Sequence, residues 1–221
     1  MLLKQVIAQQ AIPAKEASRI LAGISTDIKN SALLKMADAI EKNSDEIIAI
    51  NAEDVQAAID KGTRKNFIDR LKLTPARISA MAEGLLQTVE LPDPIGAEDF
   101  LITRPNGLQI RRVRVPFGLV GIIYEARPNV TVDAVALCIK SGNACILRGG
   151  SEAIRTNKKL ADILTQAATS AGIPEHAIEF LAITDRDAVV AMCRMRKIID
   201  VIIPRGGAGL ITRDRKSTRL N

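Results

Sequence analysis

The feature that most constrains the fold is a regular alternation of apolar runs and amphipathic stretches between residues 116 and 209. Four runs rich in aliphatic residues predict strands: "FGLVGIIYEA", "ACILRGG", "AIEFLAIT" and "IIDVIIPRGG". Three stretches between them predict helices: "PNVTVDAVALCIKSGN", "SEAIRTNKKLADILTQAATSAG" and "DRDAVVAMCRM". Strands that alternate with helices form a parallel sheet with helices on its faces. We therefore expect an α/β fold with a doubly wound, mostly parallel sheet.

The first 97 residues follow a helical pattern. Apolar residues recur there every three or four positions, as in "STDIKNSALLKMADAIEKN" and "LTPARISAMAEGLLQTVELPDP". Ser25 or Thr26, Ser44 and Thr74 are the predicted starts of three helices, and Gly62 is a predicted stop.

Residues 98–115 predict a β-hairpin. Asn106-Gly107 lies between two extended runs, and both central residues of the tightest hairpin turns need a positive φ. The second arm carries Arg111, Arg112 and Arg114 and is too polar for a domain core. We expect this hairpin to project and to pair with another chain or domain.

Composition and charge exclude several classes of function. The net charge is +6, and about half of it comes from the last ten residues, so the body is only mildly basic. Aromatic residues make up 2% of the chain, which disfavours an RNA-binding face of stacked rings. The three cysteines show no CxxC spacing, which argues against a zinc or disulfide framework and for a reducing compartment. No run approaches the ~18 apolar residues of a membrane span. We expect a cytoplasmic protein that binds no metal, nucleic acid or membrane.

The carboxyl ends of the predicted strands are the candidate ligand site, because ligands of parallel sheets bind there. Two of these ends are glycine turns that lead into helical sequence, "LRGGSEA" and "PRGGAGLI", and each carries an arginine, Arg148 or Arg205. Glycines let backbone N–H groups approach phosphate oxygens, and a helix N-terminus favours anions. Neither turn matches GxGxxG or a Walker A loop. The turns predict a nucleotide or phosphorylated ligand; alternatively, the glycines serve only the packing of helix on strand.

Two long segments, "VRVPFGLVGIIYEARPNVTVDAVALCIKSGNACILRGGSEA" and "IDVIIPRGGAGLI", resemble the γ-glutamyl phosphate reductases. This family, also called glutamate-5-semialdehyde dehydrogenase, is a branch of the aldehyde dehydrogenase superfamily, and the resemblance covers about residues 20–212. It implies a helical part (1–97) and a βαβ part (116–212) of one nucleotide-binding domain, interrupted by a hairpin (98–115) that serves homo-oligomerisation. It also implies a reaction of proline biosynthesis, in which a cysteine thiolate attacks γ-glutamyl phosphate and NADPH reduces the thioacyl intermediate.

The resemblance also implies roles for residues at the strand ends. A basic residue at the position of Arg148 lies near the adenosine ribose, where a guanidinium suits a 2′-phosphate and favours NADP(H) over NADH. The other implied cofactor contacts are Gly149, Gly150, Ser151, Glu152, Arg205, Gly206 and Gly207. Asn129 is either an amide that stabilises an oxyanion or the N-cap of a helix. Arg127 is a candidate contact for a substrate carboxylate or phosphate.

The sequence offers no candidate nucleophile. Cys138, Cys145 and Cys193 lie in apolar segments and are expected to be buried, and His176 is expected in a surface turn. Asp185 and Asp187 are expected at a helix start. The family's nucleophilic cysteine belongs to a later catalytic domain, and "RDRKSTRLN" (213–221) matches nothing in the family. We expect a truncated chain with an unrelated tail, no catalytic domain and no activity. The alternatives are a non-catalytic nucleotide-binding or regulatory module and a basic nucleic-acid binder.

Overall fold

The computed structural model describes residues 3–185 and 187–206. The predictions for Gly207 and for the tail 213–221 lie outside these residues. The helices are α1 (Leu3–Leu21), α2 (Thr26–Lys42), α3 (Ser44–Asp60), α4 (Lys65–Leu71), α5 (Pro75–Glu90), α6 (Asn129–Lys140), α7 (Ile154–Ser170) and α8 (Asp187–Cys193), with a 3-10 turn, η1 (Ser151–Ala153). The strands are β1 (Glu98–Thr103), β2 (Gln109–Val113), β3 (Leu119–Tyr124), β4 (Ala144–Arg148), β5 (Ile178–Phe180) and β6 (Val201–Arg205).

The main sheet has four parallel strands in the order β5-β4-β3-β6. All residues of β3 and β4 are buried, which explains why their sequences are continuous apolar runs. The predicted α/β class with a parallel sheet is confirmed. The chain enters the sheet at β3, adds β4 and β5 on one side, and returns to the other side with β6. The strand order therefore reverses at β3. Parallel sheets bind ligands at the carboxyl ends of the strands beside such a reversal.

β5 is shorter than the run 177–184 predicts. It pairs with β4 only over Cys145 to Leu147. Beyond it the chain passes over the end of β4, where the Arg148 guanidinium donates to the carbonyl oxygens of Thr184 (3.2 Å) and Asp185 (3.4 Å). Leu181 N still donates to Leu147 O (2.8 Å), and the apolar residues after Leu181 cross the strand end without extending the ladder.

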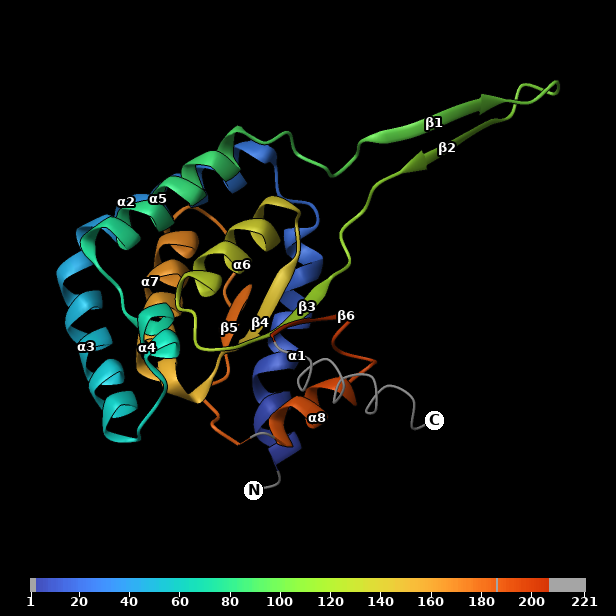
Figure 1. Ribbon diagram of the computed structural model, residues 1–221. Helices are drawn as coiled ribbons and strands as arrows, with labels where there is room; N and C mark the ends of the chain where they lie inside the picture. Colours follow the sequence, from blue (N-terminus) through green and yellow to red (C-terminus); the bar gives the residue numbers. More distant parts are fainter. Residues whose placement is uncertain (1–2, 186, 207–221) are drawn as a thin grey trace.

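Helices cover both faces of the sheet (Figure 1). Val120 and Ile122 of β3 belong to the cluster formed with α2, α5, α6 and α7. The alternate residues Leu119 and Ile123 belong to a second cluster, formed with α1 and α8. Successive side chains of a strand point to opposite faces, so the two clusters are the two layers of the core. α1, a helix that contains Pro13 and that no sequence motif singled out, thus covers one face together with α8.

The helix starts follow the predicted capping chemistry with one correction. Ser25 accepts a hydrogen bond from Ile28 N, and Thr74 accepts one from Arg77 N with Pro75 in the first turn, as expected. Ser44 is not an N-cap, because it is the first residue of α3 itself. Asn43 precedes it without a capping bond, since its side-chain amide donates to Ala39 O (2.7 Å) at the end of α2.

β1 and β2 form an antiparallel hairpin that extends away from the body (Figure 1). Every residue of both strands is exposed. The turn differs from the expected one, because only Gly107 has a positive φ (+83°) and Asn106 does not. Arg104 N donates to Leu108 O (2.8 Å) and Gly107 N to Arg104 O (2.9 Å), so the turn spans three residues. Pro105 is the physical reason: the tighter Asn-Gly turn needs an N–H at that position, and proline has none.

Candidate functional site

The carboxyl ends of β3, β4 and β6 meet at one edge of the sheet, and the loops that follow β3 and β4 touch. A Cβ on Gly150 would lie 3.0 Å from Ala126 N and 3.2 Å from the carbonyl carbon of Glu125. A Cβ on Gly149 would collide with the Asn157 amide nitrogen and lie 3.2 Å from the Tyr124 ring. The packing alternative for these glycines therefore has direct structural support. Their contact with a phosphate stays a prediction.

Arg148, Ser151 and Glu152 follow on the same edge. Arg148 is 8% exposed, and its bonds to the Thr184 and Asp185 carbonyls join the end of β4 to the segment that follows β5. Ser151 and Glu152 lie exposed in the short turn η1, which leads into α7. A buried cation next to two exposed polar residues is an arrangement that can receive a charged, polar ligand.

A buried polar chain, which no sequence motif indicated, supports this edge from below. The Tyr124 hydroxyl lies 2.6 Å from Thr131 Oγ1, and Thr131 Oγ1 donates to Asn157 Oδ1 (3.1 Å). Burial raises the pKa of Tyr124, so this phenol stays neutral at physiological pH. The chain joins β3, α6 and α7 directly beneath Gly149. Its residues belong to three separate predicted elements, and no spacing pattern relates them.

Asn129 is not an N-cap. Pro128 occupies the cap position with helical backbone angles (φ −58°, ψ −34°), and it makes no side-chain cap hydrogen bond. Asn129 is therefore one residue inside α6, where its side chain reaches along the helix and Nδ2 donates to Asp133 Oδ2 (3.2 Å). Of the two predicted roles of Asn129, the N-cap is wrong and the oxyanion contact stays a prediction.

Asp133, near the start of α6, interacts with Arg205 at the end of β6. Arg205 Nη1 lies 3.9 Å from Asp133 Oδ2. Burial raises the pKa of Asp133, and Arg205 and Asn129 only partly oppose this rise. The predicted site residues Asn129 and Arg205 thus both interact with one partly buried carboxylate, which sequence reasoning missed, and Arg127 lines the same hollow as this carboxylate.

Two hollows adjoin this carboxylate. The first, which we call the α5 hollow, has a volume of about 300 Å³ and lies between α4, the start of α5 and the start of α6. Its polar lining is Asp69, Arg70, Arg77, Arg127, Asn129 and Asp133. The second, the β6 hollow, has about 380 Å³ at the ends of β3 and β6 and is lined by Arg70, Tyr124, Glu125, Arg127, Arg205 and Gly206, with Val130. Arg70 and Arg127 line both. Arg70 and Arg77 come from helices to which the sequence assigned no function.

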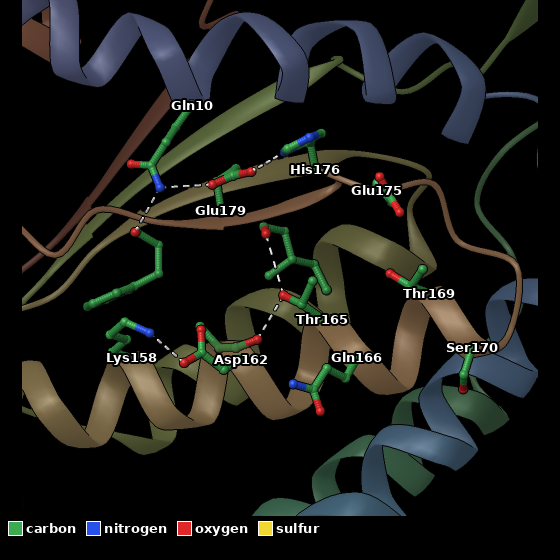
Figure 2. Close-up of a pocket in the computed structure, with 13 residues that line it drawn as sticks. Gln10, Lys158, Asp162, Thr165, Gln166, Thr169, Ser170, Glu175, His176 and Glu179 are labelled. Atoms are coloured by element: carbon green, nitrogen blue, oxygen red, sulfur yellow. Dashed lines mark hydrogen bonds and ion pairs between the residues drawn. The ribbon is translucent and has the colours of Figure 1, made fainter.

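A third hollow lies beside the outermost strand β5, between α1, β5 and α7, and has a volume of about 770 Å³ (Figure 2). Apart from Glu175, its charged groups are paired with each other: His176 with Glu179 (2.7 Å) and Lys158 with Asp162 (2.6 Å). Gln10 donates to the carbonyl of Phe180 (3.3 Å) and Thr165 to that of Ile178 (3.5 Å), so side chains cover the outer edge of β5. His176 lies in an exposed turn, as predicted. We therefore place the candidate site at the strand ends.

No thiol reaches either hollow at the strand ends. Cys138, Cys145 and Cys193 are all buried, as predicted. A hydrogen bond with Cys138 and burial raise the pKa of Cys145 well above its usual value, which disfavours the thiolate. In the described part of the chain, no group of His, Cys, Asp and Glu side chains is arranged to hold a metal ion. The helices between residues 3 and 206 include none that is both long and apolar enough to cross a bilayer.

The parallel sheet with its strand-end site defines a class of protein: residues 4–207 match the aldehyde dehydrogenase family, and the chain belongs to that family. Within it, the chain is 56% identical over 198 residues to γ-glutamyl phosphate reductase of Moorella thermoacetica, covering 90% of this chain and 47% of that protein. It is 48% identical to the same-named protein of Thermodesulfovibrio yellowstonii, covering 99% of this chain and 52% of that one. The chain thus spans about half the length of the curated relatives it matches.

Solved structures agree with this assignment. The crystal structure of γ-glutamyl phosphate reductase from Thermotoga maritima superposes with a TM-score of 0.93 at 40% identity, over 96% of this chain and 51% of that one. An acetylating aldehyde dehydrogenase from Geobacillus thermoglucosidasius gives a TM-score of 0.76 at 19% identity, over 97% of this chain and 44% of that one. The second likeness concerns the fold alone.

Proposed function

We propose that this chain serves the reaction of a γ-glutamyl phosphate reductase, the NADPH-dependent reduction of γ-glutamyl phosphate to glutamate-5-semialdehyde in proline biosynthesis. The observation that carries the proposal is the identity of about half of all residues with reductases of that name, over nearly the whole chain. The cationic hollows at the strand ends support it, because substrate and cofactor are both anions.

The residues present fit a nicotinamide dinucleotide. The absence of side chains at Gly149 and Gly150 lets the loops after β3 and β4 approach each other closely, and Arg127 and Arg205 line the β6 hollow together with Gly206. When bound, the cofactor supplies the hydride. Arg205, Gly206 and Gly207 would hold its pyrophosphate, and Arg148, Gly149, Gly150, Ser151 and Glu152 would border its adenosine ribose. In this proposal the positive charge of Arg148 selects the 2′-phosphate of NADP(H).

Asn129 is the proposed contact to the reacting end of the substrate, and Arg127 is the proposed contact to a substrate carboxylate or phosphate. The Asn129 amide already donates to Asp133, whereas Arg127 lines both hollows. A guanidinium in this position suits a carboxylate or a phosphate, because Arg binds the oxygens of either in a bidentate manner. The three buried thiols are not proposed as nucleophiles, since an attacking thiolate must reach the substrate. We therefore propose that this chain by itself does not turn over substrate.

Titration of the chain with NADPH and NADH tests the cofactor proposal. We expect NADPH to bind more tightly, and Arg148→Gln to lower NADPH affinity by about tenfold or more while NADH affinity changes little, since a charge-assisted hydrogen bond contributes roughly 1.5–3 kcal/mol. Arg104→Gln, in the exposed hairpin turn, removes the same charge far from the site and should leave both affinities unchanged. Equal affinity of the wild type for both cofactors would remove the argument for a 2′-phosphate contact.

A further inference from the structure

The α5 hollow contains two guanidinium groups that no carboxylate neutralises. Among the described residues, the Arg127 side chain forms no ion pair or hydrogen bond, and Arg70 contacts only the ring of Phe67, with 5.7 Å between Cζ and the ring centroid. Arg77, the third arginine, is already engaged with the backbone carbonyls of Asp69 and Lys72, and it forms an ion pair with the Asp69 carboxylate (3.4 Å), which also lines the hollow. Two arginines that face the same hollow without anionic partners form a receptor for an oxyanion.

The same hollow has a carboxylate on its α6 wall. Asp133 is 42% exposed in its side chain, and its nearest cation, Arg205, lies 3.9 Å away on the side of the β6 hollow. On the side of the α5 hollow it receives only the amide of Asn129. Burial raises the pKa of Asp133 more than Arg205 and Asn129 lower it, so a ligand cation beside the carboxylate would stabilise its charged form.

A carboxylate and an ammonium on one carbon, as in an α-amino acid, match these two features together. The β6 hollow continues from the other side of Arg127 to the end of β6, where Arg205 and Gly206 lie. A ligand that fills both hollows would therefore have an amino-acid end under α5 and an anionic end at the strand ends.

We propose that the α5 hollow binds the amino-acid end of the substrate, with Arg70 and Arg127 on its α-carboxylate and Asp133 on its α-ammonium. This identification of the ligand rests on the function proposed above. Arg70, Arg127 and Asp133 are then specificity-determining residues that distinguish an α-amino acid derivative from a simple dicarboxylate derivative, and they orient the acyl phosphate toward the cofactor edge.

NMR titration of the ¹⁵N-labelled full chain with L-glutamate, glutarate and inorganic phosphate tests the proposal. We expect L-glutamate to shift the resonances of residues around the α5 hollow and to bind at least about tenfold more tightly than glutarate, which lacks the ammonium. Arg70→Gln and Arg127→Gln should each weaken L-glutamate binding by about tenfold or more. Asp133→Asn should weaken L-glutamate but leave glutarate unchanged. Arg104→Gln is the matched control and should change neither.

Several outcomes would overturn the proposal: no binding of L-glutamate, equal affinity for glutarate, or Asp133→Asn without effect. Competition by inorganic phosphate at these arginines would mean that they hold the phosphoryl end. The substituted side chains are at least partly exposed, and melting curves from circular dichroism would verify folding. NADPH titration of the same samples separates the two claims: NADPH binding without L-glutamate binding refutes only the amino-acid hollow, and the reverse refutes only the proposed cofactor role.

Discussion

Gly149 and Gly150 show how single residues shape the strand-end edge. Neither residue has a positive φ. Glycine is required at both positions because neighbouring atoms crowd the place of a side chain. A Cβ of Gly149 would overlap the Asn157 amide and lie 3.2 Å from the Tyr124 ring, and both side chains belong to the buried polar chain that includes Thr131. Buried groups linked in this way resist displacement, since moving one breaks hydrogen bonds of the others.

Gly149→Ala should therefore destabilise the chain by about 1–3 kcal/mol through overpacking. Urea unfolding followed by circular dichroism measures this. Gly84→Ala is the control: Gly84 lies within α5, and a Cβ added there would meet no atom within 4 Å, so alanine should stabilise the helix by up to about 1 kcal/mol. Equal effects of the two substitutions would show that the crowding around Gly149 relaxes freely.

At the level of elements, a buried ionic cluster joins three helices at the base of the hairpin. Asp93 forms an ion pair with Lys29 of α2 and accepts hydrogen bonds from Thr26 Oγ1 (2.7 Å) and Ile95 N (3.0 Å). Lys140 of α6 donates to Asn30 Oδ1 (2.7 Å) and to Val89 O (2.9 Å) of α5. The cluster fixes the point where the chain leaves α5 and enters the hairpin.

Asp93→Asn should destabilise the chain by about 3 kcal/mol, because Lys29 is left buried without its counter-charge. Burial alone would raise the pKa of Asp93, but the hydrogen bonds from Lys29, Ile95 and Thr26 together lower it. A carboxyl with a lowered pKa stabilises the fold above its unfolded pKa of about 4, and this contribution is lost as the pH falls through the folded pKa. Unfolding measured from pH 6 down to pH 3 should show a smaller acid-dependent loss in Asp93→Asn than in the wild type.

Asp38→Asn offers the comparison for Asp93. Asp38 pairs with Lys42 on the exposed face of α2, and both side chains are more than half exposed. This substitution should change the free energy of unfolding by no more than about 0.5 kcal/mol. If Asp93→Asn behaved in the same way, the buried cluster would contribute no net stability.

Local chemistry decides which elements can be predicted from the sequence. The buried strands β3 and β4 and the helices that begin after Ser25 and Thr74 depend on residues close in sequence. The hairpin turn differs from its prediction because Pro105, next to the Asn-Gly pair, removes an N–H that the tighter turn needs. β5 is shorter than predicted because Arg148, about 36 residues earlier, holds the segment that follows it.

For the whole molecule, the part of the candidate site that could be predicted depends on whether its residues are related by the strand pattern or only by the packing of distant helices. Parallel topology alone brings Arg127, Arg148 and Arg205 to one edge. Arg70, by contrast, reaches the hollows only because α4 and α5 pack near the start of α6, and no spacing rule relates residues so far apart. Asn129 shows a third case, in which a one-residue shift of the helix start changes the role of a side chain.

The hairpin formed by β1 and β2 is the part of the molecule that we expect to pair with another chain. Six of its apolar side chains are between 37% and 56% exposed: Phe100, Leu101, Ile102, Leu108, Ile110 and Val113. Ile102 and Ile110 face each other across the strands, and alternate residues such as Leu101 lie on the other face. Exposed apolar strands of this kind pair with another chain, and we propose that a second copy of this protein covers the face of Ile102 and Ile110.

The double substitution Ile102→Lys with Ile110→Lys should shift the protein toward the monomer, because both charges would be buried in the contact. Size-exclusion chromatography with light scattering gives the mass. The unfolding free energy of the monomer should remain within about 0.5 kcal/mol, since these side chains contact no core. Leu101→Lys tests the opposite face and should leave the mass unchanged. A wild-type chain that is monomeric at all accessible concentrations would contradict the proposal.

The position of α1 has a consequence for biosynthesis. α1 is the first described helix, yet its packing partners lie in β3, β4 and α8, and Lys15 pairs with Asp200, which is 185 positions later. At translation rates of about 5–20 residues per second, α1 leaves the ribosome roughly ten to forty seconds before the last of these partners is made. Until β3 and β4 are made, its apolar face, with Ile7 and Ala11, has no sheet to cover and is available to chaperones. The layer of α1 and α8 is therefore completed last, because α8 is made after the helices of the opposite layer, α2, α5, α6 and α7.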